Sequence, residues 1–130
     1  MITFLKAEEQ HQHSNGGGWV ANTAVVAASA YIGPDAWVSD NAQVCDNAWV
    51  CGDAQVYGDA CVCSHALVYS TAQVYGDARV YGDARVYGDA QVCDDALVSG
   101  NARVYGDALV SGDARVSGNA ILVTSKGERQ

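Results

Sequence analysis

The chain has 130 residues, the usual size of a single domain. Its 7 basic and 15 acidic residues give a net charge of −8, which argues against nucleic acid and anionic membranes as partners, because both attract clustered positive charge. No apolar run approaches the roughly 20 residues of a membrane span, and the start lacks the regions of a secretory signal. Since five cysteines is also an odd number, we expect a cytoplasmic protein with free thiols.

Residues 1–17 precede the regular part of the sequence and read as an N-terminal cap or arm. The segment combines an apolar start, which includes Phe4 and Leu5, with a polar stretch and two glycines. We expect it to cap the structure that follows or to reach a neighbour, because an open parallel sheet exposes unpaired amides and carbonyls. Phe4 and Leu5 are the expected anchors, against Trp19 or Trp37.

Residues 18–125 repeat with a period of six. Alanine recurs at every sixth position from Ala24 to Ala120, an aliphatic residue follows two places later, and Asp or Asn usually precedes the alanine. In the consensus Ala-x-Val-x-Gly-Asp, Ala and Val point to the same side of a strand, and the x residues point to the other. Gly-Asp favours a turn. Period six does not fit a helical face, so the pattern predicts a coil of short parallel strands, each about four residues long and stacked about 4.8 Å apart.

This repeat resembles that of the hexapeptide-repeat proteins, over residues 18–125. The resemblance implies an all-β fold, a left-handed parallel β-helix (β-solenoid) with about six triangular coils of three hexapeptides. The Val-Tyr-Gly-Asp-Ala-Arg units resemble a branch of that family found in enterobacteria and phages. The best-known members are acyltransferases, but this chain places its glycine one position later than their common pattern. We expect residues 126–130 to form a charged tail.

Three sides per coil place residues that are eighteen apart in one column, which defines three outer faces. The first face carries Val25, Gln43, Cys61, Arg79, Leu97 and Arg115 beside Ala27, Cys45, Cys63, Tyr81, Ser99 and Ser117. The second face carries Tyr31, Trp49, Leu67, Arg85, Arg103 and Ile121 beside Gly33, Cys51, Tyr69, Tyr87, Tyr105 and Val123. The third face carries Trp19, Trp37, Gln55, Gln73, Gln91 and Leu109 beside Ala21, Ser39, Tyr57, Tyr75, Cys93 and Ser111.

The third face is the candidate interaction surface, because it holds no charged residue whereas the other two carry arginines. Its aromatic residues are of the types enriched at interface cores, and its stacked glutamines can bond one another or a second copy. The candidate interface residues are Trp19, Trp37, Gln55, Tyr57, Gln73, Tyr75, Gln91 and Leu109. We expect a homo-oligomer, a dimer or trimer, since closed symmetry is the norm and the resembled family commonly forms trimers; another protein is the alternative partner.

Catalysis is the less favoured hypothesis. The resembled acyltransferases use a histidine as general base, often with a loop extruded from the coil. Of the three histidines only His65 lies in the repeat, at a corner where Asp or Asn is usual, and no insertion interrupts the eighteen units. The sequence therefore favours a non-enzymatic structural or interaction module. The alternative is an acyltransferase-like enzyme with an acyl-CoA donor and His65 as its base.

Two weaker metal hypotheses remain open. Cys45, Cys61, Cys63 and His65 offer soft ligands for zinc, although their spacing is not a zinc signature and a flat sheet splays side chains apart. A corner column of Asp59, Asp77, Asp95 and Asp113 offers oxygen ligands for calcium. The simpler explanation is that the cysteines fill space, that the carboxylates accept their own turn amides, and that nearby arginines offset the charge. The preferred expectation is no metal and no cofactor.

Overall fold

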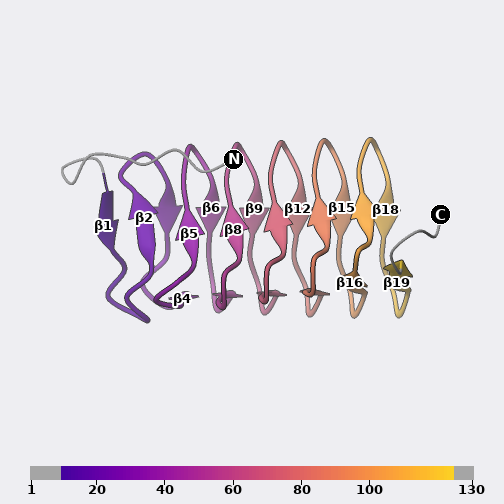
Figure 1. Cartoon of the computed structure of the whole chain (residues 1–130), viewed down its shortest axis with the longest axis horizontal. Helices are drawn as coiled ribbons and strands as arrows, with labels where there is room; N and C mark the ends of the chain where they lie inside the picture. Colours follow the sequence, from indigo (N-terminus) through magenta and orange to yellow (C-terminus); the bar gives the residue numbers. More distant parts are fainter. Residues whose placement is uncertain (1–9, 125–130) are drawn as a thin grey trace.

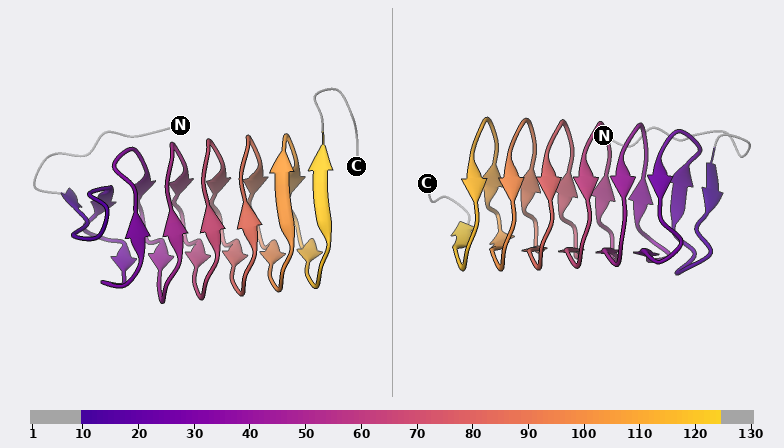
Figure 2. Two further views of the ribbon diagram at one scale, coloured as in Figure 1. Left: turned by 90° about the horizontal axis from the view of Figure 1, so that it is seen from below. Right: turned by 180° about the vertical axis from the view of Figure 1, so that it is seen from behind.

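The computed structural model describes residues 10–124 as an all-β rod in which every strand from β2 onward runs parallel to its neighbours (Figure 1). About six coils stack along the long axis, and further views show the same regular spacing from below and behind (Figure 2). No helix occurs in this range. The predicted fold class is confirmed as a parallel β-solenoid, consistent with the left-handed β-helix. None of the described segments forms an apolar helix of membrane-spanning length.

Three sheets form the sides of the coil and correspond to the three faces. The sheet of the third face contains β1 (Gln10–Gln12), β2 (Trp19–Ala21), β5 (Trp37–Val38), β8 (Gln55–Val56), β11 (Gln73–Val74), β14 (Gln91–Val92) and β17 (Leu109–Val110). The sheet of the first face contains β3 (Val25–Val26), β6 (Gln43–Val44), β9 (Cys61–Val62), β12 (Arg79–Val80), β15 (Leu97–Val98) and β18 (Arg115–Val116). The sheet of the second face contains β4 (Tyr31–Ile32), β7 (Trp49–Val50), β10 (Leu67–Val68), β13 (Arg85–Val86), β16 (Arg103–Gly106) and β19 (Ile121–Thr124).

The strands pair with a register of eighteen residues, so the predicted columns are present. Gln55 pairs with Gln73, for example, and Gln73 pairs with Gln91. Most strands are two residues long rather than about four. The reason is that the residue after each valine still donates one ladder hydrogen bond, as in Tyr57 N to Val74 O at 3.0 Å, but the chain then bends into the corner. Short strands suffice here because every coil repeats the same bonds.

A tight turn makes each corner. In the turn from Tyr57 to Ala60, the Ala60 amide donates to the Tyr57 carbonyl at 3.4 Å, and Gly58 has a φ of 68°. Three such positions hold aspartate instead, namely Asp40, Asp46 and Asp94, with φ of 57–58°. Each of these carboxylates accepts a hydrogen bond from the amide eighteen residues later. Aspartate is tolerated at these three positions because its carboxylate bonds the next coil.

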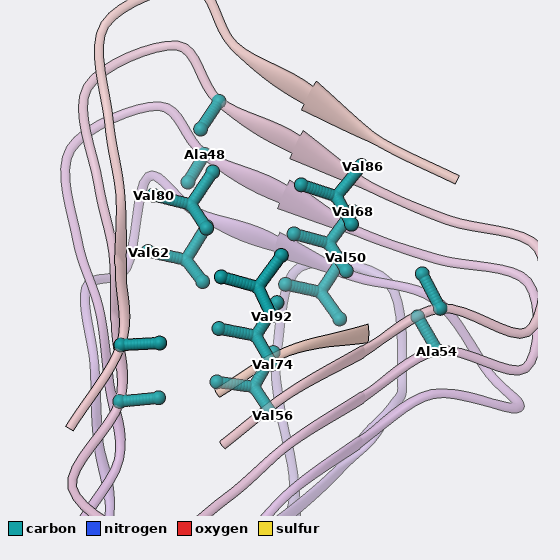
Figure 3. Close-up of a cluster of buried hydrophobic side chains, with 14 of the residues drawn as sticks. Ala48, Val50, Ala54, Val56, Val62, Val68, Val74, Val80, Val86 and Val92 are labelled. Atoms are coloured by element: carbon teal, nitrogen blue, oxygen red, sulfur yellow. The ribbon is translucent and has the colours of Figure 1, made fainter. Parts of the chain in front are cut away.

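Alanine and valine fill the interior, as predicted. From Ala30 to Ala108 every repeat alanine and the aliphatic residue two places later are fully buried. Figure 3 shows the valines of all three sheets directed toward one narrow core. The exception is the last described coil, where Ala114 and Ala120 are exposed and Val116 and Leu122 are only half-buried. Burial of an inward residue thus depends on having a coil on both sides.

The opposite end of the rod is covered. Strand β1 pairs antiparallel with β2, an arrangement that the sequence pattern does not reveal. The buried ring of His13 makes a 2.8 Å hydrogen bond through Nε2 to the Ala30 carbonyl, and the Ile32 amide donates to the Asn15 carbonyl. The expected anchors Phe4 and Leu5 lie outside the described residues, so the extent of the arm stays a prediction.

Candidate functional site

The third face is one continuous sheet, and most of its outward side chains are half-buried. The rings of Trp19 and Trp37 stack with centroids 6.3 Å apart, and those of Tyr57 and Tyr75 stack at 4.9 Å with an interplanar angle of 3°. This order follows from the register, because identical residues eighteen apart occupy the same place on successive coils; strands β2, β5 and β8 follow one another along the rod (Figure 1). Leu109 is the most exposed residue of the face, at 53%.

The glutamines of this face bond tyrosines of the preceding coil. The Tyr57 hydroxyl donates to Gln73 Oε1 at 3.4 Å, and the Tyr75 hydroxyl donates to Gln91 Oε1 at 3.2 Å. The sequence suggested that the glutamines bond one another, but it could not show this diagonal pairing. The consequence is that contacts within the chain itself hold these tyrosine rings and glutamine amides in place.

The phenols of the third face stay neutral at physiological pH. A hydrogen bond with Cys93, followed by burial, raises the pKa of Tyr75 to about 12. Burial, with smaller contributions from Cys93 and Asp40, also raises the pKa of Tyr57. Cys93 itself is 6% exposed and closes the column above Tyr75. The third face therefore presents aromatic and amide groups without a charge.

The second face has aromatic ladders too, but with charge beside them. The rings of Tyr69, Tyr87 and Tyr105 stack at 4.8 and 4.9 Å. In the adjacent column Arg85 lies in register with Arg103. A ladder of stacked tyrosines therefore lies beside amide side chains on the third face, and a second ladder lies beside guanidinium groups on the second face.

The three candidate zinc cysteines lie on the first face and are half-buried. Burial, followed by the neighbouring Cys63, raises the pKa of Cys45 to about 12, and burial also raises the pKa of Cys61. The thiols of Cys45 and Cys61 are therefore protonated at neutral pH in the metal-free chain. Cys61 Sγ instead lies 3.7 Å from Gln43 Oε1, as a weak donor. His65 is exposed and lines a groove with residues of the second face.

The candidate calcium residues remain spread along one corner. Asp59, Asp77, Asp95 and Asp113 are all exposed and occupy successive coils. Among residues 10–124 no three His, Cys, Asp or Glu side chains come together in a way that could hold a metal ion. Neither the zinc set nor the calcium set is therefore gathered into a site.

Two open grooves run along corners, and the sequence reasoning missed both. The arginine groove, with a volume of about 720 Å³, is lined by His65, Asp83, Arg85, Asn101, Arg103 and Asn119, with Leu67 and Ile121 at its ends. The aspartate groove, with a volume of about 490 Å³, is lined by Asp59, Cys61, Asp77, Arg79, Asp95 and Leu97. Each groove lies between a corner column and the first outward column of a face. A comparison of these two columns in the sequence would have indicated both grooves.

Comparison with known proteins identifies the repeat. The family model described as "YdcK Beta solenoid repeat" matches residues 42–58, 72–88, 78–94, 90–106, 98–112, 102–118 and 108–123, which together cover more than half of the chain. No curated protein and no solved structure matches the chain. The match supports a β-solenoid repeat; the narrower expectation of a hexapeptide-repeat protein of enterobacterial or phage type stays a prediction.

Proposed function

This chain belongs to the YdcK beta solenoid repeat family, and we propose that it is a non-enzymatic structural module that associates with further copies of itself through the third face. The observation that carries the proposal is the absence of charge from both outward columns of this face, in a chain with a net charge of −8. Charged residues are depleted at interface cores, whereas tyrosine and tryptophan are enriched there.

The order of the face supports the proposal. Tyr57 and Tyr75 are held by stacking and by hydrogen bonds to glutamines of the next coil. Immobilising a flexible side chain on association costs about 0.5–1.5 kcal/mol. Because these side chains are already fixed in the free chain, little of that cost remains. The neutral phenols add no charge to be desolvated.

The size of the face predicts weak association. Six coils stacked about 4.8 Å apart, with about four residues across each side, give a face of about 29 by 13 Å, or about 380 Å² per copy. Stable interfaces bury about 800 Å² per partner. We therefore expect a dimer or trimer whose formation depends on protein concentration, with the corner residues completing the contact.

Light scattering over a range of protein concentrations tests the proposal. The double substitution Gln73→Arg with Tyr75→Glu places opposite charges in the centre of the face and should return the protein to a monomer. The matched control is Leu97→Arg with Ser99→Glu, which makes the same changes at equivalent positions of the first face and should leave the mass unchanged. A wild-type protein that is monomeric throughout, or an oligomer that survives the third-face substitutions, would remove the hypothesis.

The acyltransferase alternative rests on His65. The imidazole is exposed in the arginine groove, and between residues 18 and 124 the coil passes every corner without an extruded loop. A dose-dependent rise of the melting temperature with acetyl-CoA would favour this alternative, and a His65→Ala variant would show whether the effect depends on that side chain.

A further inference from the structure

We propose that the arginine groove binds a small ligand with two neighbouring oxyanion groups, either phosphoryl or carboxylate. This inference concerns the second face and is independent of self-association through the third. The groove is lined by two guanidinium groups, two side-chain amides, an imidazole and a single carboxylate, that of Asp83. Hydrogen-bond donors therefore outnumber acceptors in it, which is the composition that an oxyanion needs.

The two arginines lie in register on adjacent strands, and neither forms an ion pair within the described residues. Arg85 and Arg103 pair in register on adjacent parallel strands, which places their Cα atoms about 4.8 Å apart. Among the described residues neither guanidinium takes part in an ion pair or a hydrogen bond. Two positive charges on neighbouring side chains repel each other, and an anion between them would turn that repulsion into attraction. Leaving two such groups unpaired is unexpected in a chain with 15 acidic residues.

Neighbouring side chains lie on both sides of the arginine column. On one side, burial and then Tyr87 raise the pKa of Tyr69, while the positive charges of Arg85 and Arg103 lower it. On the other wall the Asn101 side-chain amide donates to Asn119 Oδ1 at 3.3 Å. This bond leaves the amide of Asn119 available to a ligand.

The length of the charged part limits the size of the ligand. Leu67 lies in register below Arg85, and Ile121 lies in register above Arg103. The positive charge thus spans two coils and ends at an apolar side chain in both directions. A long polyanion would find no further cation along this column, whereas a ligand with two oxyanion groups would match its length.

The aspartate groove is a natural control. It has the same position relative to its own strands, but it holds one arginine and three aspartates. Arg79 lies there between Cys61 and Leu97 and has no second arginine in register. The same backbone therefore presents one donor-rich groove and one acidic groove, and only the first suits an anion.

Isothermal titration calorimetry of the full chain at low salt tests the proposal with three probes: inorganic diphosphate, succinate and orthophosphate. We expect one binding site for a probe with two oxyanion groups, weaker binding of orthophosphate, and loss of affinity at high salt. Tighter binding of diphosphate than of succinate would assign the ligand to the phosphoryl class, and the reverse would assign it to the carboxylate class. Binding of neither probe would overturn the proposal.

Charge-removing variants place the site. Arg85→Gln and Arg103→Gln should each weaken binding by about three- to tenfold, the range between an exposed ion pair and a hydrogen bond to a charged group. Arg79→Gln, the control in the aspartate groove, should leave affinity unchanged. All three side chains are exposed, so the variants should keep the wild-type circular dichroism spectrum. Equal weakening by Arg79→Gln, or none by the other two, would contradict the assignment.

A variant that is expected to bind its ligand more tightly provides a second test, which does not depend on a loss of affinity. Ile121 is 60% exposed and continues the column of Arg103. Ile121→Arg would add a third guanidinium in register, and we expect it to tighten binding of inorganic triphosphate by about three- to tenfold. If affinity for triphosphate stayed at the wild-type value, the arginine column would not be the determinant of binding.

Discussion

Two stretches of the first face have the same sequence but different environments. Asp-Ala-Arg-Val occurs at residues 77–80 in the middle of the rod and at residues 113–116 in the last described coil. Ala78 and Val80 are fully buried, whereas Ala114 is exposed and Val116 is only half-buried. The repeat unit alone therefore does not bury its own side chains; the coils on either side do. In such a solenoid each coil is stabilised by its nearest neighbours.

The largest effect expected from this difference comes from a charge placed in the core. Val80→Asp would bury a carboxylate without a partner and should destabilise the protein by about 4 kcal/mol or more, or prevent folding. Val116→Asp makes the same change where water is accessible, and we expect about 1 kcal/mol or less. Thermal and urea unfolding followed by circular dichroism measure both. An unchanged melting temperature for Val80→Asp would refute the inward assignment of valine.

A smaller difference is expected at the corner glycines. Gly76 and Gly112 both have positive φ, 68° and 61°, so alanine costs about 1–2 kcal/mol at either position through backbone strain. A Cβ at Gly76 would lie 2.8 Å from the amide nitrogen of Asp94, but a Cβ at Gly112 meets nothing within 4 Å. We expect Gly76→Ala to cost about 1–2 kcal/mol more than Gly112→Ala, because the neighbouring backbone must move. Equal unfolding free energies would mean that the coils separate easily.

The sequence was sufficient for the architecture because one period determines everything inside the rod. Regular spacing of Ala24 to Ala120 fixed the inward columns and the eighteen-residue register, and both are present. The sequence was not sufficient for features that depend on contacts between different kinds of residue or segment. The antiparallel pairing of β1 with β2 lies outside the repeat. The bond from Tyr57 to Gln73 depends on side-chain length and rotamer, which no spacing rule specifies.

The candidate sites show the same limit. The third face could be singled out by the composition of its columns alone, because absence of charge is visible in the sequence. The zinc hypothesis stays a prediction: Cys61 and Cys63 lie on the first face, whereas His65 lines the groove beside the second face. The two grooves were missed because each is formed between two columns of residues. Once the columns are placed side by side, the grooves differ in the number of aspartates that line them.

The smallest expected effect is on a single hydroxyl that depends on the coil above it. The pKa of Tyr75 rises to about 12 because Cys93 of the next coil bonds the phenol and the site is partly desolvated. A tyrosine that ionises less readily when folded stabilises the fold fully below its unfolded pKa of about 10. That contribution is lost as the pH rises toward about 12, because the unfolded chain then releases its proton first. We therefore expect stability to decline between these values, with a shallower decline in Tyr75→Phe. The control is Tyr81→Phe, which removes a phenol from the first face and leaves the contact between Tyr75 and Cys93 intact. Equal slopes for Tyr75→Phe and wild type in urea unfolding at several pH values would show that the neighbouring coil does not control this hydroxyl.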